Sequence, residues 1–207
     1  MRGIKLAAVT LVIASLGGCA TTGTDSLQCN LARILGQGCG AEVVQTSERW
    51  ARVQKAFDEE INQARQAQQK AVASSASLPA KQQASAGEVT TLNVAITDSK
   101  TQEKRMVRTL DTVAVNLPLA GKGKRAHVAT FDAILDFANT VADNRGTASV
   151  IVYQNPADVK AGRANPTGTV LKSPSGKPVS VRKEADSSIP VGMERYVVKA
   201  GEVRGQL

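Results

Sequence analysis

The chain has 207 residues, and 26 Lys or Arg against 18 Asp or Glu give it a formal net charge of +8. This length admits one domain of ordinary size with accessory segments. Hydrophobic residues make up 42% of the chain, but one Trp, two Tyr and three Phe are its only large aromatic residues, so its core must be small and aliphatic. The basic residues are spread along the sequence without interleaved aromatic residues, which argues against nucleic acid as a partner.

The beginning of the chain has the layout of a secretory signal peptide. Two basic residues precede an almost unbroken apolar run at 6–16 (LAAVTLVIASL), and two glycines then lead to Cys19. The run holds about eleven residues, whereas a helix that spans a bilayer needs roughly twenty. Cleavage near Cys19 is therefore expected. The alternative is an ordinary signal peptide that is cut near Ala20 and leaves Cys19 unmodified.

The sequence LGGC at 16–19 resembles the lipobox of bacterial lipoproteins. This resemblance implies that residues 1–18 are removed and that Cys19 carries a thioether-linked diacylglycerol and an amide-linked third chain. Two or three chains anchor a protein durably, since each buried methylene contributes about 0.8 kcal/mol. Because Ala20 follows the cysteine, where Asp commonly favours the inner membrane, the resemblance implies the outer membrane. The mature chain would hold 24 basic and 18 acidic residues, a net charge of +6.

Residues 19–40 predict a lipidated leader that contains a disulfide loop. Cys29 and Cys39 would lie beyond the inner membrane, where thiols oxidise, and a loop of that size contributes roughly 3 kcal/mol. Redox activity is the alternative, but a catalytic pair usually has the spacing Cys-x-x-Cys. Two thiols and one distant histidine do not supply the four ligands of a structural zinc site.

Residues 41–73 predict one long amphipathic helix. Trp50, Val53, Phe57 and Ile61 recur at steps of three or four, which is helical periodicity. The apolar face is narrow and fades into alanine, and the opposite face carries Arg, Lys, Glu and Gln. Two interpretations remain open. The helix is an arm that binds a partner or another copy, or these four residues pack on the chain's own C-terminal domain while the rest of the helix is a solvated stalk.

Residues 74–87 (SSASLPAKQQASAG) predict a flexible linker, because a segment rich in Ser, Ala and Gln cannot bury enough surface to fix itself. A lipobox, two cysteines that follow it closely and a charged, Gln-rich helix together look like the conjugation-apparatus lipoproteins of type IV secretion. This resemblance covers about residues 16–75 and implies a role in an envelope assembly.

Residues 88–207 predict an α+β domain, in which a small mixed or antiparallel sheet is packed with one helix at 129–144. In the first strand, Leu92, Val94 and Ile96 are expected to face the core. The expected strands are 89–97, 104–109, 112–116, 148–153, 169–172, 178–183 and 193–200. The run at 148–153 (ASVIVY) is continuous enough to be a central strand, and in the last strand Tyr196 and Val198 share one face. Between them, prolines and glycines at 156–168 break the chain repeatedly.

Few residues of this domain suggest catalysis. His127 is the only histidine, and without a nucleophile motif such as Gly-x-Ser-x-Gly a surface or helix-flanking histidine is expected. Asp132 and Asp136 are four residues apart and share a helix face. Calcium binding or acid–base catalysis is an alternative for this pair, but a solvated helix face is the simpler interpretation.

Lys122, Lys124 and Arg125 make the loop before this helix basic and predict a site for an anionic glycan or lipid. The spacing is not that of a P-loop, and no catalytic residue, cofactor or metal is predicted. The sequence therefore predicts a non-enzymatic outer-membrane lipoprotein that faces the periplasm and acts as a protein-interaction or scaffold component of an envelope or secretion assembly. The alternative is an anionic glycan- or lipid-binding module of the cell envelope.

Overall fold

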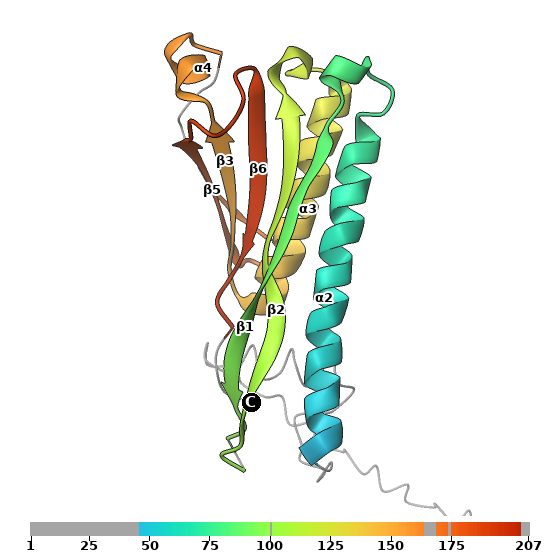
Figure 1. Cartoon of the computed structure of the whole chain (residues 1–207), viewed down its shortest axis with the longest axis vertical. Coiled ribbons are helices and arrows are strands. Elements are labelled where there is room, and N and C mark those ends of the chain that lie inside the picture. The colour runs from blue at the N-terminus through green and yellow to red at the C-terminus, as the bar shows by residue number, and fades with distance from the viewer. Residues whose placement is uncertain (1–45, 100, 164–168, 174, 204–207) are drawn as a thin grey trace, which may run out of the picture.

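A computed structural model of the chain describes residues 46–99, 101–163, 169–173 and 175–203 (Figure 1). The predicted signal peptide and the disulfide loop lie outside these residues. In chain order, the elements are α2 (Thr46–Ser74), η1 (Ala80–Gln82), β1 (Ser85–Thr97), β2 (Lys104–Pro118), η2 (Leu119–Gly121), α3 (Arg125–Arg145), β3 (Ala148–Gln154), α4 (Pro156–Lys160), β4 (Thr169–Lys172), β5 (Pro178–Ala185) and β6 (Met193–Ala200).

The strands form one mixed sheet of six strands in the order β1-β2-β6-β3-β5-β4. Only β3 and β5 run parallel, and the other neighbouring pairs are antiparallel. The predicted α+β class and the internal position of β3 are therefore confirmed. The sheet packs with two long helices rather than the expected one, because both α2 and α3 contribute to the same core as the strands.

The apolar face of α2 packs on the chain's own domain. Its buried apolar residues are Trp50, Val53, Phe57, Ile61, Ala64 and Ala71. The first three contact Ile96 and Val107, which lie in the part of the β1–β2 ribbon that extends past the rest of the sheet. The other three belong to the main core beneath α3. The helix therefore packs on the chain's own domain, as the second interpretation expected, but the solvated stalk expected after Ile61 is wrong, because Ala64 and Ala71 are buried as well.

The segment 74–87 folds against the domain through a few buried residues, so its prediction as a flexible linker is wrong. Ser75 and Ala84 are buried, and the Ala84 N–H donates to Ser75 Oγ at 2.7 Å. β1 already begins at Ser85. Small side chains allow this close packing, although the segment has few large apolar residues. The helix and the C-terminal domain consequently form one unit rather than two.

β1 and β2 pair with irregular register, which the sequence did not indicate. The two strands expected at 104–109 and 112–116 are one strand, in which Asp111 is the extra residue between the Leu110 and Thr112 pairs. A bulge of this kind increases the local twist. Of the three residues expected to face the core, Ile96 is buried and Val94 is partly buried, whereas Leu92 is 40% exposed.

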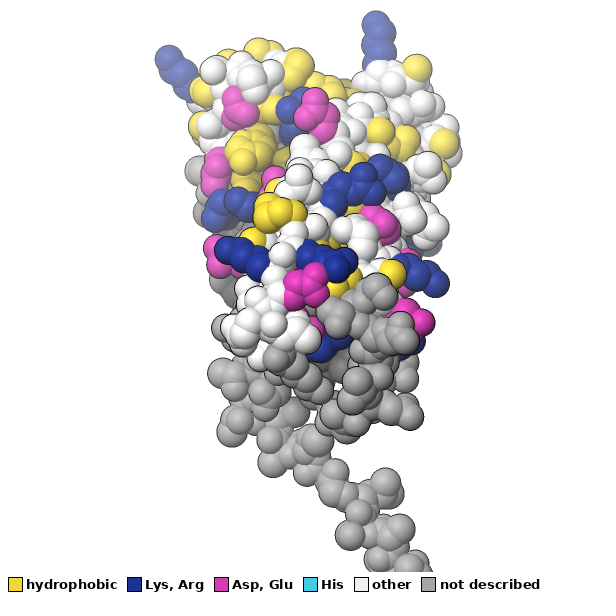
Figure 2. All heavy atoms as spheres, turned by 60° about the horizontal axis from the view of Figure 1, so that its bottom comes forward, with side chains coloured by type: hydrophobic (Ala, Val, Ile, Leu, Met, Phe, Trp, Pro, Cys, Tyr) yellow, Lys and Arg dark blue, Asp and Glu magenta, His cyan; other side chains and the backbone are white. Residues whose placement is uncertain are grey.

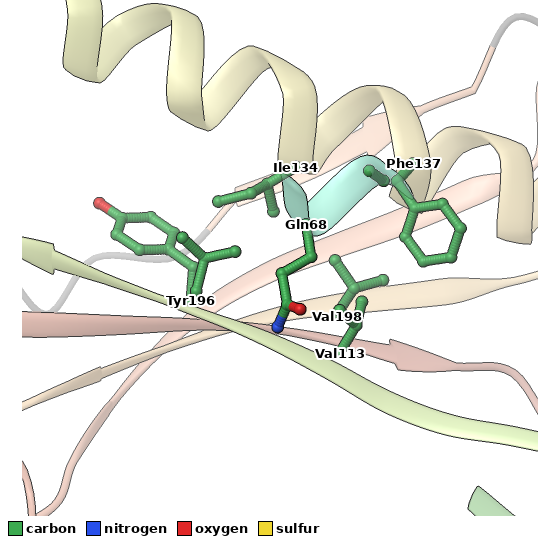
Figure 3. Close-up of a pocket in the computed structure, with 8 residues that line it drawn as sticks. Gln68, Val113, Ile134, Phe137, Tyr196 and Val198 are labelled. Atoms are coloured by element: carbon green, nitrogen blue, oxygen red, sulfur yellow. The ribbon is translucent and has the colours of Figure 1, made fainter. Parts of the chain in front are cut away.

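A second irregularity lies near Gly87 and is bridged by a side chain of α2. Gln68 Nε2 donates to Gly87 O at 2.9 Å and to Ala114 O at 2.7 Å. The Gln68 side chain points between α3 and the sheet, towards apolar residues such as Val113 and Phe137 (Figure 3). The cavity beside it is about 10 Å³, the lower limit for a single water.

α3 begins one turn earlier than predicted. Thr130 lies inside the helix, where its hydroxyl donates to Ala126 O at 3.0 Å. The predicted stop is confirmed, because Gly146 adopts φ 87° and its N–H donates to Ala142 O. The earlier start brings the whole basic loop to the end of the molecule where α2 also ends.

Candidate functional site

Four connecting segments meet at one end of the molecule, above the sheet in Figure 1. This end, called the apex below, consists of residues 79–82, 118–128, 155–163 and 189–193. Loops that a rigid scaffold positions together are where binding residues concentrate. The apex is therefore the candidate site, and its polar contacts decide what it can do.

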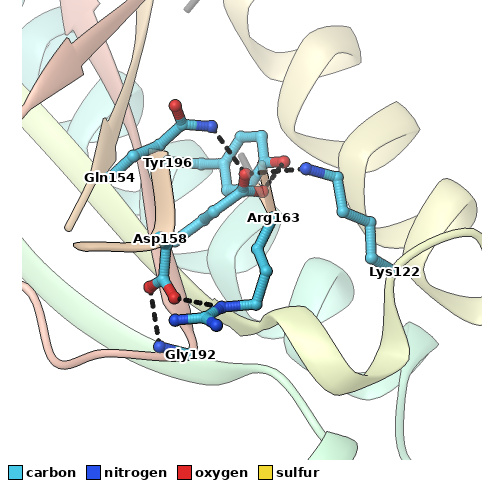
Figure 4. Close-up of polar contacts among 7 residues, drawn as sticks. Lys122, Gln154, Asp158, Arg163, Gly192 and Tyr196 are labelled. Atoms are coloured by element: carbon cyan, nitrogen blue, oxygen red, sulfur yellow. Dashed lines mark hydrogen bonds and ion pairs between the residues drawn. The ribbon is translucent and has the colours of Figure 1, made fainter. Parts of the chain in front are cut away.

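A buried carboxylate joins three elements at the apex (Figure 4). Glu194, at the start of β6, is 3% exposed and accepts hydrogen bonds from Lys122 Nζ at 3.0 Å, Gln154 Nε2 at 2.7 Å and the Tyr196 hydroxyl at 2.7 Å. Burial, and then the adjacent Glu194 charge, raise the pKa of Tyr196 above its usual range. The phenol therefore stays protonated and donates to the carboxylate.

A second buried carboxylate fixes the turn before β6 (Figure 4). Asp158 accepts from the Gly192 N–H at 2.7 Å and from Arg163 Nε at 2.7 Å. Burial acts to raise the pKa of Asp158, but these hydrogen bonds and the Arg163 charge outweigh it and hold that pKa below its usual range. Asp158 is therefore ionised at neutral pH, with both oxygens bonded.

Asn155 ties α4 to the same turn. Its Oδ1 accepts from the Ala157 N–H at 2.8 Å and caps α4, while its Nδ2 donates to Ile189 O at 2.6 Å. Proline at the first position of the helix fits this arrangement. The segment that the sequence suggested only as a series of chain breaks is thus an ordered part of the apex.

His127 holds η1 and η2 against α3. It was expected on the surface or beside the helix, and it is buried in the first turn of α3, where its Nε2 lies 2.8 Å from Gln82 O. Because a carbonyl only accepts, Nε2 carries the proton. A Cβ on Gly121 would overlap the imidazole ring, so only glycine fits at that position. These contacts give His127 a structural role.

The three predicted anion-binding residues have different surroundings. Lys122 pairs with Glu194, and Lys124 Nζ donates to Gln82 Oε1 at 2.5 Å. Arg125 is exposed and forms no hydrogen bond or ion pair with the part of the chain that the structure describes. Two of the three cations are thus engaged in joining apex segments, and a shared anion site remains a prediction.

The remaining predicted groups add no reactive centre to the apex. Asp132 and Asp136 are exposed on α3, in agreement with a solvated face. Within the described ranges, no three His, Cys, Asp or Glu side chains are arranged to hold a metal ion. None of the helices in the described part of the chain is long and apolar enough to cross a membrane. Cys19, Cys29 and Cys39 lie outside the described residues.

The fold and apex define an α+β protein whose surface loops are fixed by buried carboxylates. No protein family, no curated protein and no solved structure matches the chain. Its function is therefore argued from its own residues.

Sequence reasoning missed the acidic residues that organise the apex. Glu194 and Asp158 are single carboxylates in unrelated segments. Gln154, which donates to Glu194, is 40 residues away in the chain, and Gly192, which donates to Asp158, is 34 residues away. No local spacing indicates such contacts. The dipeptide Asn155-Pro156 was the one available signal, since it is typical of a helix start.

Proposed function

We propose that this protein is a non-enzymatic outer-membrane lipoprotein that faces the periplasm and serves as an interaction or scaffold component of an envelope assembly. Cys19 carries the acyl chains, and the α+β body recruits a protein partner. The lipobox supports the anchor, and the arrangement of the body supports the second part.

The observation that carries the proposal is the position of the two described chain ends. α2 begins at Thr46, and Val203 packs against the cluster that contains Trp50, near the start of α2. The apex lies at the other end of α2, and 29 residues at about 1.5 Å each separate the two ends by about 43 Å. An anchor before Thr46 would attach the body by one end and present the apex away from the membrane (Figure 1).

The engaged polar groups of the apex support binding rather than catalysis. Both oxygens of Asp158 and of Glu194 already accept hydrogen bonds, and His127 is bonded to a main-chain carbonyl. A general acid or base must reach its substrate directly or through one water. A well-fixed surface of this kind is suited to holding a partner.

Labelling with radioactive palmitate tests the anchor. The wild-type protein is expected to be labelled and to fractionate with the outer membrane, whereas Cys19→Ser is expected to be unlabelled. The double variant Cys29→Ser/Cys39→Ser is the matched control and should keep the label. An unlabelled, freely soluble wild-type protein would contradict the proposal.

Cross-linking followed by purification tests the partner. The lipidated protein is expected to co-purify with a specific envelope protein, and Cys19→Ser should recover less of it because it is no longer held at the membrane. Recovery of the lipidated protein alone would count against an interaction role.

A further inference from the structure

The apex is strongly basic at its surface. Its four segments contain six basic residues and the buried Asp158, and two more carboxylates, the buried Glu194 and the half-buried Asp186, border the last segment. Three of the cations, Lys81, Arg125 and Lys160, are exposed and form no hydrogen bond or ion pair within the described part of the chain. By contrast, acidic and basic side chains are intermixed over the face that Figure 2 shows. The apex therefore offers positive charge that the protein itself does not neutralise.

Two exposed valines also belong to the apex segments. Val191 is 61% exposed and Val128 is 52% exposed, and with Leu92 and Met106 they are the large apolar side chains that are exposed in the described residues. A partner that covers the apex would gain from burying both valines.

The turn that carries Val191 is fixed on both sides. Ile189 is 2% exposed, the Gly192 N–H donates to Asp158, and Gly192 O accepts from the Leu119 N–H at 2.8 Å. A surface that is already ordered loses little conformational entropy when it binds. Fixing loops with buried carboxylates is consistent with a surface that must keep one shape.

We propose that the apex is the docking surface for an acidic, partly apolar surface of an envelope protein. This inference rests on the proposed function and names the surface and the chemistry of the partner. Unneutralised cations at Lys81, Arg125 and Lys160 complement carboxylates, and Val128 and Val191 complement apolar side chains. A protein is favoured over an anionic glycan or lipid headgroup because valines at this position match apolar side chains and the apex segments contain no Trp, Tyr or Phe to stack on a sugar ring.

Site-specific photo-cross-linking in cells tests the docking surface. A benzophenone amino acid replaces Val191 in the full lipidated protein, and the matched control carries it at Met106, which is 65% exposed in the β1–β2 ribbon at the opposite end. The expected result is an adduct from position 191 but not from position 106, in which mass spectrometry identifies an acidic peptide of an envelope protein.

Charge reversal tests the electrostatic part of the proposal. The triple variant Lys81→Glu/Arg125→Glu/Lys160→Glu is expected to reduce the position-191 adduct by at least about tenfold, because like charges then face one another. The control Arg65→Glu/Lys104→Glu/Lys199→Glu changes the net charge equally on exposed residues outside the apex, and the adduct should persist. Purified lipopolysaccharide and phosphatidylglycerol vesicles serve as probes for the other anionic occupants.

The outcomes separate this inference from the proposed function. A partner that co-purifies but cross-links at position 106, or through a peptide without acidic residues, overturns the docking surface and leaves the proposed function intact. No adduct at position 191, equal losses in both triple variants, or charge-dependent binding to lipopolysaccharide or vesicles in place of a protein also overturns it. Loss of palmitate labelling from the wild type refutes the anchor instead.

Discussion

A buried ion pair connects the two long helices, and its removal gives the strongest stability prediction. Arg145 and Glu60 are 6% and 7% exposed. Arg145 Nε donates to Glu60 Oε1 at 3.0 Å, Nη2 donates to Oε2, and Nη1 donates to Gly201 O at 3.0 Å. The guanidinium also lies over the Phe57 ring, 5.7 Å from its centroid. One arginine thus joins α3 to α2 and to the segment after β6.

Removing one partner leaves the other charge buried without compensation. Glu60→Leu and Arg145→Met are each expected to lower the free energy of unfolding by about 3–5 kcal/mol, a large part of the roughly 5–15 kcal/mol of a typical domain. The double variant has no buried charge at this pair, so its loss of unfolding free energy should be well below the sum of the losses of the two single variants. A coupling energy of at least about 1 kcal/mol between the two positions is expected.

Urea unfolding of the non-lipidated full chain at neutral pH measures these differences. The matched control is the ion pair between Arg108 of β2 and Asp58 of α2, whose charged atoms lie 2.9 Å apart. Its side chains are 59% and 41% exposed, so the pair is similar in geometry but not buried. Because solvent screens an exposed pair, its coupling energy should be below about 1 kcal/mol. Equal losses for Glu60→Leu and Asp58→Leu would refute the reasoning from burial.

Three further variants test the other contacts. Gly121→Ala is expected to cost about 1–3 kcal/mol because the added Cβ overlaps the His127 ring; an unchanged thermal midpoint would show that the ring can move aside. Gln68→Leu is expected to cost about 1–3 kcal/mol by depriving two carbonyls of their donor, and urea unfolding checks this loss against wild type. Asp158 has a folded pKa below its ordinary value of 3.8, so its stabilisation is present above that value and is lost as pH falls through the folded pKa. The stability difference between wild type and Asp158→Asn should therefore shrink as the pH falls below 3.8 and through the folded pKa, and a constant difference in acid titration would contradict the role of its ionised form.

The elements with strong periodicity could be predicted from the sequence. The steps of three and four from Trp50 to Ile61 gave the buried face of α2, and the run from Ala148 gave an internal strand. β6 was predicted at its observed bounds, with Tyr196 and Val198 on one face, and both contribute to the main core. In these elements one face must be buried, and local spacing alone identifies it.

The parts that failed depend on contacts between distant segments. The segment 74–87 has the composition of a linker, but Ala84 packs in the core with residues of α2, α3 and β2, and the buried Ser75 accepts its N–H. The register shift near Gly87 is tolerated because the side chain of Gln68, 19 residues earlier, donates to the Gly87 and Ala114 carbonyl groups. Similarly, Glu194 is surrounded by donors from three separate elements. None of these partners can be identified from spacing.

The position of α2 limits where a partner can bind. Gln54 accepts from the Arg108 N–H at 3.2 Å and donates to Arg108 O at 3.2 Å, so it occupies main-chain groups of β2. Gln68 occupies other main-chain groups about four turns further along the same side of the helix. Between them lie the buried Phe57, Ile61 and Ala64, which pack against the ribbon and the core. Releasing α2 as a free arm would expose this apolar face and leave both sets of polar groups without partners, at a cost of several kcal/mol. A partner must therefore bind a surface that the fold leaves available, and the basic apex with its exposed valines is the described surface whose chemistry best specifies one.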